Sequence, residues 1–182
     1  MPLDDEKRLV ELAKLGDGEA FSQLYEAYFD RVYRFIFFRV TDDGIAEDLA
    51  SQVFLKAWEN LHRYHPRGPF LAWLYAIARN TVIDNYRTRK QVVSLDEAMP
   101  IPAPDEKLDD RMDLEVDMQA LQAAMQRLTE EQQEVITLKF IADYDTAHIA
   151  KQMGKSEGAI RALQMRALQA LARAMKKDQK RK

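Results

Sequence analysis

The side chains with the most specific chemistry in this 182-residue sequence lie near its C-terminal end. Arg161 and Gln164 are of the types that make paired hydrogen bonds to guanine and adenine edges in a DNA major groove. Lys155 and Arg166 lie close to them in the sequence and can neutralise backbone phosphates. These four residues predict an element that reads duplex DNA, with Arg161 and Gln164 on the bases.

The element that must position these side chains has the pattern of a helix-turn-helix. A short helix is expected over residues 146–153 and to end at Gly154, and a longer one is expected to follow Ser156, a good N-cap. Ala150, Gly154 and Ile160 have the spacing that two tightly crossing helices require, because bulkier residues would clash there. An ordinary helical hairpin is the alternative, and the basic side chains favour DNA binding.

The net charge of −3 hides an uneven distribution along the chain. Residues 1–94, 95–117 and 118–182 carry formal charges of −1, −7 and +5. Residues 61–94 contain a basic block of +5, and residues 151–182 contain one of +8. Basic blocks of this kind are typical of surfaces that bind nucleic acid, although a solvated face or a frayed tail has the same composition.

The first basic block mixes aromatic, amide and charged groups in one expected helix. This mixture suits stacking on unpaired bases together with neutralisation of phosphates. The residues concerned are Trp73, Arg79, Asn80, Asp84, Tyr86, Arg87, Arg89 and Lys90. Packing in the core is the alternative for Trp73 and Tyr86.

The acidic segment separates two helical regions. Three of the six prolines fall in the stretch Met99–Asp105, which blocks helix formation. The flanks show apolar residues three and four positions apart and no strict two-residue alternation. The sequence therefore predicts an all-α protein with two small domains, residues 1–94 and 118–182, joined by a flexible, acidic, proline-containing linker over residues 95–117.

The expected helices can be placed from their apolar positions and caps. The N-terminal domain is expected to be a bundle of about four helices, one of which has a buried face between Ala46 and Leu61. In the C-terminal domain Thr129 and Gln132 have the spacing of a capping box.

Several classes of protein are disfavoured by composition. The chain has no cysteine, which excludes a disulfide scaffold and a thiolate metal site and favours a reducing compartment, so the cytoplasm is expected. The longest apolar stretches are too short to span a bilayer, and the acidic N-terminus lacks an export signal. His62 and His65 lie near Glu59, but Pro66 ends that helix and no further ligand is evident. No metal, cofactor or enzyme activity is expected.

Four segments in order resemble one protein family. They are Gly18–Tyr25, Ala46–Trp58, Phe70–Asn80 with the nearby Asp84, and Ile149–Leu171. Together they are similar to the bacterial extracytoplasmic-function sigma factors, the two-domain members of the sigma-70 class. The resemblance covers nearly the whole chain. It implies a protein that binds the RNA polymerase core and directs it to promoters, with region two in the N-terminal domain and region four in the C-terminal domain.

The resemblance also implies roles for individual residues. The residues implied to dock on the polymerase clamp helices are Asp48, Ser51, Gln52 and Leu55. The residues implied to open and read the minus-ten element are Arg63, Arg67, Trp73, Arg79, Asn80, Asp84 and Arg87. The residues implied to lie on the minus-thirty-five duplex are Lys155, Ser156, Glu157, Arg161, Gln164 and Arg166.

The implied partners are the clamp helices and flap of core polymerase, promoter DNA and an anti-sigma factor. Ser51 and Gln52 stand where many relatives have Gln and Glu, which leaves this face polar but changes its contacts. A different function is the main alternative: a helix-turn-helix regulator that binds DNA by itself and uses its N-terminal helices as a sensor or dimerisation domain. An enzyme is a second alternative, which the sequence does not favour.

Overall fold

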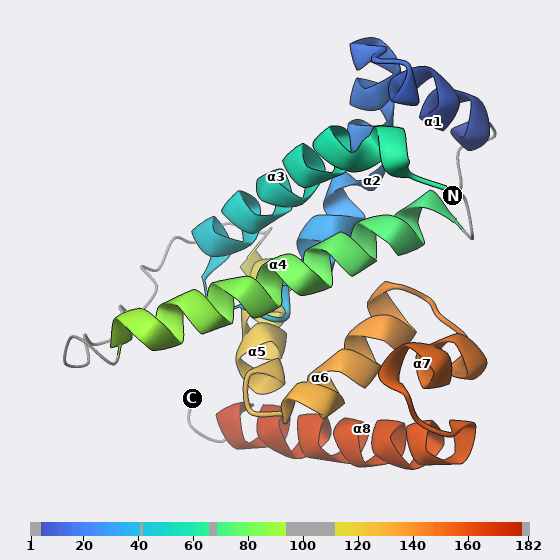
Figure 1. Ribbon diagram of the computed structural model, residues 1–182. Helices are drawn as coiled ribbons and strands as arrows, with labels where there is room; N and C mark the ends of the chain where they lie inside the picture. Colours follow the sequence, from blue (N-terminus) through green and yellow to red (C-terminus); the bar gives the residue numbers. More distant parts are fainter. Residues whose placement is uncertain (1–4, 41, 66–68, 94–111, 180–182) are drawn as a thin grey trace.

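The computed structural model describes residues 5–40, 42–65, 69–93 and 112–179 (Figure 1). Every regular element among these residues is a helix, in agreement with the all-α prediction. No helix within the described ranges is long and apolar enough to cross a membrane. Arg67 and most of the expected linker lie outside the described residues.

The N-terminal domain contains four α-helices and one short turn of 3-10 helix. Their bounds are α1 Glu6–Lys14, α2 Gly18–Phe37, α3 Asp43–Asn60, η1 Leu61–Arg63 and α4 Phe70–Val93. Asp17 and Asp42 begin α2 and α3, because each carboxylate accepts hydrogen bonds from the first free amides of its helix. Helices α2, α3 and α4 pack on one another, and α1 packs on α2.

The C-terminal domain contains four α-helices and one π-helical turn. Their bounds are α5 Met112–Met125, α6 Glu130–Ile136, η2 Thr137–Ile141, α7 Thr146–Met153 and α8 Glu157–Gln179. The predicted capping box is present at the start of α6. Helix α5 begins within the range 95–117 that the sequence assigns to the linker. Residues 112–117 contain no proline or glycine, and acidic residues are favourable in the first turn of a helix, so the composition of this stretch allows a helix.

The π-helical turn was not predicted. The amide of Ala142 donates to the carbonyl of Thr137 at 3.0 Å, and the Thr137 hydroxyl donates to the Gln133 carbonyl at 2.7 Å. The wider turn leaves Leu138 fully buried while Phe140 is 54% exposed. A π-helical turn closes its hydrogen bond over one more residue than an α-helical turn, and no spacing of apolar residues in the sequence indicated it.

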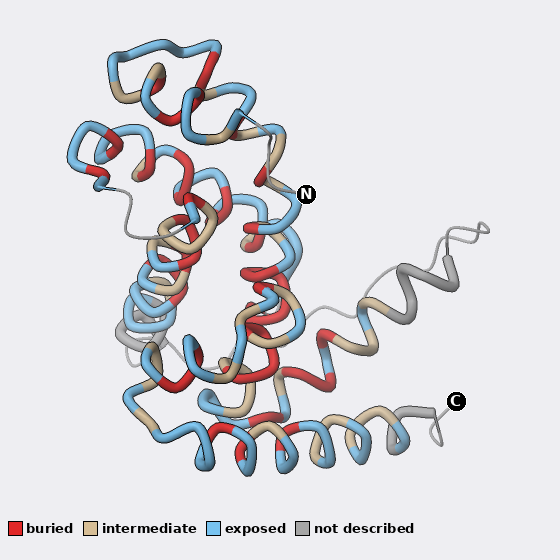
Figure 2. The backbone as a smooth tube through the Cα atoms, turned by 90° about the vertical axis from the view of Figure 1, so that its right-hand side faces the viewer, coloured by how far each residue is buried: buried red, intermediate tan, exposed pale blue. Residues whose placement is uncertain are grey.

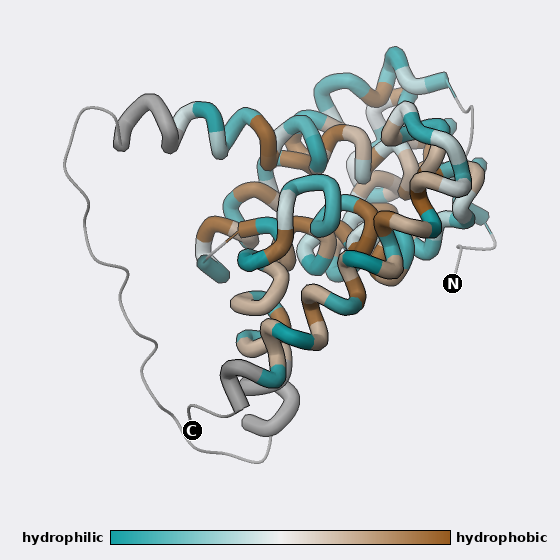
Figure 3. Tube along the Cα trace, turned by 90° about the horizontal axis from the view of Figure 1, so that it is seen from below, coloured by the Kyte–Doolittle hydropathy of each residue, from teal (hydrophilic) through white to brown (hydrophobic). Residues whose placement is uncertain are grey.

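Buried residues lie along the inward faces of the helices in both domains (Figure 2). Along α4, hydrophobic and hydrophilic positions alternate around the helix (Figure 3). The buried residues of the two domains belong to one apolar cluster. The two domains are therefore in direct contact.

Gln122 of α5 and Gln126, which directly follows α5, anchor the C-terminal domain to the last residue of α2 and to Val40 after it. The Gln122 Nε2 donates to the carbonyls of Phe37 at 2.9 Å and Val40 at 3.1 Å. The Gln126 Nε2 donates to the same Val40 carbonyl at 3.0 Å. The carbonyl of Phe37, at the end of α2, lacks a partner within the helix, and the carbonyl of Val40 lies outside any helix, so these amides satisfy groups that would otherwise need water.

Candidate nucleic-acid and partner surfaces

The predicted helix-turn-helix is formed by α7 and α8. Asp145 begins α7: its carboxylate accepts from the His148 amide at 2.8 Å and contacts the His148 Nδ1 at 2.9 Å. These hydrogen bonds from the backbone and side chain of His148 lower the pKa of Asp145. Gly154 ends α7 in a left-handed conformation, φ 64°, and this turn lets the Lys155 amide donate to the Ala150 carbonyl.

Ala150 and Ile160, whose spacing with Gly154 predicts this motif, lie in its core. Ile149 and Ile160 are fully buried, and Ala150 and Leu163 are nearly so. The Ser156 hydroxyl accepts from the Ala159 amide at 3.2 Å, which is the expected N-cap of α8. The first turns of α8 are therefore held firmly against α7.

The predicted duplex-reading residues divide into exposed and half-buried positions. Arg161 is exposed and forms an ion pair with Glu157 at 2.8 Å, one turn earlier on α8. Lys155 is half-buried and forms an ion pair with Glu131 at 2.8 Å. Gln164 is also half-buried, at the edge of the outward face. The structure brings Ser156, Glu157, Arg161 and Arg166 to the surface of one helix and places Gln164 to one side.

Most of the predicted minus-ten residues that are described lie along α4 and the turn before it. Asn80, Asp84 and Arg87 are exposed on α4, and Arg63 is exposed in η1. Trp73 is half-buried, with its ring centroid 4.8 Å from that of Tyr64 and 5.5 Å from that of Phe70. Trp73 is thus packed against the core on one side and open on the other.

Arg79 has a different environment from its neighbours on α4. Its Nε lies 2.9 Å from the Glu134 Oε1 of α6, in the other domain. The buried Arg39 lies over the ring of Phe35 at 4.5 Å. Burial lowers the pKa of Arg39, the Glu134 carboxylate opposes this shift, and Arg79 adds to it. Glu134 therefore faces two guanidinium groups at the contact between the domains.

A tyrosine contact extends this junction. The Tyr75 hydroxyl donates to the Ile141 carbonyl at 3.4 Å, and its ring lies 6.3 Å from that of Tyr144. Burial raises the pKa of Tyr75 to about 12, with a smaller opposing effect of Arg31. The Tyr75 side chain is therefore a neutral hydrogen-bond donor at ordinary pH.

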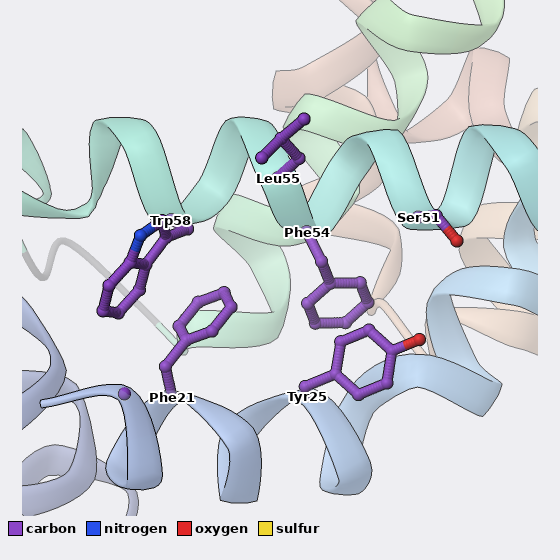
Figure 4. A pocket seen from close by; sticks show the side chains of 7 residues that line it. Phe21, Tyr25, Ser51, Phe54, Leu55 and Trp58 are labelled. Atoms are coloured by element: carbon purple, nitrogen blue, oxygen red, sulfur yellow. The ribbon is translucent and has the colours of Figure 1, made fainter.

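The outward face of α3 carries the four residues implied to bind polymerase. Asp48, Ser51, Gln52 and Leu55 are all exposed, and Leu55 is 58% exposed. Beside them an apolar groove of about 390 Å³ lies between α2 and α3 (Figure 4). Its lining residues are Gly18, Phe21, Tyr25, Ser51, Phe54, Leu55 and Trp58.

The buried face that the sequence predicts between Ala46 and Leu61 contains Phe54 and Trp58, and both line this groove. Phe21 and Trp58 have ring centroids 4.8 Å apart, and Tyr25 and Phe54 have centroids 4.7 Å apart. Trp58 remains 37% exposed, so these rings cover the core and also form a surface. The sequence feature that could have indicated this groove is a large aromatic residue, Trp58, next to the polar face of α3.

No group of three or more His, Asp or Glu side chains in the described part of the chain could hold a metal ion.

Two family models match the chain. Sigma-70 region 2 matches residues 24–92, and Sigma-70 region 4 matches residues 118–171. The two ranges together make up about two thirds of the sequence. The first range lies within the N-terminal domain and the second within the C-terminal domain.

Curated relatives match over a larger part of the chain. The ECF RNA polymerase sigma factor BldN of Streptomyces coelicolor is 39% identical over 173 residues, which are 93% of this chain and 66% of the relative. The ECF RNA polymerase sigma factor SigX of Bacillus subtilis is 29% identical over 163 residues, which are 86% of this chain and 84% of the relative.

The fold is also similar to that of a solved complex. The sigma factor RpoE bound to the anti-sigma factor NepR, from Bartonella quintana, matches with a TM-score of 0.68 and 24% identity. The match covers 86% of this chain and 96% of the solved one.

Proposed function

This chain belongs to the extracytoplasmic-function sigma factors of the sigma-70 class, and we propose that it directs core RNA polymerase to specific promoters. The proposal assigns residues 1–94 to region two, 95–117 to the linker and 118–182 to region four. The chain itself supplies no catalysis: polymerase forms the phosphodiester bonds, and this protein selects and opens the DNA in the cytoplasm.

The surface of α3 carries this proposal. A regulator that works by itself needs one DNA-binding surface, whereas this chain also presents a polar face with an apolar groove beside it. Exposed Leu55 and half-exposed Trp58 provide apolar area next to the acidic Asp48. Apolar and aromatic anchors with a polar rim are typical of protein interfaces. We assign Asp48, Ser51, Gln52 and Leu55 to the contact with the polymerase clamp helices.

The minus-ten role belongs to α4 and the turn before it. An extruded base needs a ring to stack on and a group that bonds to its edge. Trp73 offers an open ring face, and Asn80 offers an exposed amide two turns along α4. The same minus-ten DNA element is assigned to the remaining residues of the set, Arg63, Arg67, Arg79, Asp84 and Arg87. Arg79 must then leave Glu134 before it can reach DNA.

The minus-thirty-five role belongs to α8. Arg161 is the exposed guanidinium on its first turns, and Glu157 orients it through their ion pair. Lys155 and Arg166 are assigned to phosphates, and Ser156 and Glu157 to the same duplex. Gln164 is assigned to the same duplex, from its position at the edge of the outward face.

Run-off transcription distinguishes the sigma factor from a regulator that binds DNA alone. Purified protein is expected to bind duplex promoter DNA weakly, and to support promoter-specific transcripts when core polymerase is added. Tight, sequence-specific binding to duplex DNA without polymerase, and no specific transcript with it, would instead identify an autonomous regulator.

A pair of charge-changing variants tests the polymerase face. Asp48→Lys combined with Gln52→Lys is expected to weaken core binding without loss of helical content, because both side chains are exposed on α3. Gln23→Lys combined with Asp30→Lys is the matched control. These two exposed residues lie on the side of α2 away from the groove, so core binding is expected to be normal. Equal losses in both pairs would count against the assigned face.

An anti-sigma factor is a further partner in this proposal. The aromatic groove of α2 and α3 offers exposed apolar area that such a protein could cover. A bound anti-sigma factor is then expected to compete with core polymerase for this protein in a pull-down assay. Simultaneous binding of both would contradict a shared surface.

A further inference from the structure

Met165 has an unusual position on α8. Ile160, Leu163 and Ala167 are buried on the side of α8 that packs on the rest of the domain. Each residue of an α-helix advances by about 100°, so Met165 lies about 140–160° from each of these three. Its side chain is 63% exposed. Met165 is therefore a large apolar side chain at the centre of the outward face of the second helix of the helix-turn-helix.

Neither folding nor helix propensity accounts for a methionine here. Lys, Arg, Gln and Glu favour helices about as well as Met and are better solvated at an exposed position. Among the outward positions before Met165, Gly158 has no side chain and Ala162 has only a methyl group. A Cβ atom on Gly158 would meet only the Ser156 hydroxyl, at 4.0 Å. Contacts within the protein therefore do not explain why these positions are small and apolar.

The charges around Met165 match a polyanion. Arg161 and Arg166 are both exposed and lie four residues before and one residue after Met165. The segment 151–182 contains ten basic and two acidic residues. An apolar centre with arginines at its sides suits a DNA major groove, where phosphates line the edges and bases form the floor.

The major groove offers one apolar group to such a side chain, the 5-methyl group of thymine. Because α8 is the proposed reader of the minus-thirty-five element, this inference rests on the proposed function. We infer that the Met165 thioether contacts a thymine methyl group on the groove floor and makes the protein prefer thymine at that position. Arg161 then reads a neighbouring base edge, and Gln164, at the edge of this face, reaches the side of the groove.

Replacing thymine by deoxyuridine tests this contact, because uracil keeps the hydrogen-bonding groups of thymine and lacks only the methyl. A promoter that the holoenzyme transcribes is substituted at each minus-thirty-five thymine in turn. For the natural protein, one position is expected to lose about fourfold in holoenzyme affinity, the value of one buried methyl group. For Met165→Ala holoenzyme the same substitution is expected to have no effect.

Two further variants complete the comparison. Met165→Leu keeps an apolar side chain and is expected to retain the thymine preference. Met175→Ala shortens a methionine further along α8 and is expected to leave the whole thymine scan unchanged. All variants are checked for native helical content and for normal binding to core polymerase.

The outcomes separate this inference from the proposed function. Equal sensitivity to deoxyuridine in the natural and Met165→Ala holoenzymes, or none in either, would overturn the thymine contact while transcription remained intact. Weaker binding of Met165→Ala to core polymerase, with an unchanged thymine scan, would also overturn it and place a protein on this face. Absence of promoter-specific transcription by the natural holoenzyme would refute the proposed function itself.

Discussion

The Arg79 Nε of α4 lies 2.9 Å from the Glu134 Oε1 of α6, and this ion pair joins the two domains. The Glu134 side chain is only 16% exposed, and the Arg79 side chain is 34% exposed. Buried Arg39 lies close enough to both for their charges to affect its pKa. A single carboxylate thus compensates two cations, one of which is assigned to promoter DNA.

Glu134→Gln is expected to loosen the contact between the domains. Without the carboxylate, Arg39 and Arg79 repel each other in a poorly solvated site, at a cost of about 1–3 kcal/mol. The expected result is a larger radius of gyration in small-angle X-ray scattering, with unchanged helical content. Glu131→Gln is the matched control, because Glu131 pairs with Lys155 inside the C-terminal domain. An equal expansion in both variants would contradict a specific role for Glu134.

The raised pKa of Tyr75 predicts a loss of stability at alkaline pH. The native state keeps the phenol proton up to about pH 12, whereas the unfolded state loses it near pH 10. The contribution of Tyr75 is therefore complete below about pH 10 and falls as pH rises towards 12. Urea unfolding is expected to show a smaller alkaline decline for Tyr75→Phe, which retains the ring contact with Phe35 at 4.8 Å. The same decline in both proteins would assign the effect to other groups.

Two neighbouring residues of α3 are expected to separate binding from folding. Leu55→Ala truncates an exposed side chain, so the free energy of unfolding is expected to change by less than about 0.5 kcal/mol. Its affinity for core polymerase is expected to fall by more than about 1 kcal/mol. Phe54→Ala removes a side chain of a residue that is only 3% exposed and is expected to cost about 3–5 kcal/mol of stability. Normal polymerase affinity of Leu55→Ala would remove this residue from the interface.

Arg161→Ala is expected to reduce promoter discrimination by about 1–3 kcal/mol with little effect on core binding. The measurement compares transcription from a cognate promoter and from one altered in the minus-thirty-five element. Glu157→Gln removes the ion-pair partner of Arg161 and is also expected to reduce promoter discrimination, but by a smaller amount. Equal losses of promoter discrimination and core binding would identify Arg161 as a structural residue.

Gly154→Ala is expected to destabilise the helix-turn-helix by about 1–2 kcal/mol, because φ is 64° at this position. An added Cβ atom would meet no other atom within 4 Å, so the cost is conformational. Gly154→Asn is expected to cost less, since asparagine adopts this conformation more readily. Urea unfolding measures the loss of stability in both variants. A larger loss for Gly154→Asn than for Gly154→Ala would indicate a steric origin.

The helices and their caps followed from local sequence. The apolar spacing of α3, the capping box of Thr129 and Gln132, and the glycine turn at Gly154 depend on residues within one or two turns of each other. The burial of Ile160 and the exposure of Asp48 likewise follow from the positions of nearby residues on the same helix. Local hydrogen bonds and one-sided burial determine these features, so spacing alone predicts them.

The contacts between the domains could not be predicted in the same way. Gln122 donates to carbonyls of Phe37 and Val40, 85 and 82 positions earlier in the chain. Nothing in the sequence around Gln122 distinguishes it from a glutamine that is exposed to solvent. Arg79 was grouped with Asn80 because both lie in the same expected basic helix and in the segment that resembles the family, yet Arg79 faces Glu134. Such pairings depend on how the two domains pack against each other, and local sequence patterns do not predict this packing.

The groove of α2 and α3 has a practical consequence for measurement. The chain has two tryptophans, and each lies on a different proposed surface. Trp58 packs against Phe21 in the groove, and Trp73 packs on Tyr64 at the start of α4. With the other tryptophan changed to Phe, the fluorescence of Trp58 reports polymerase docking and that of Trp73 reports base stacking. The order in which the two surfaces engage during initiation can thus be followed without an added dye.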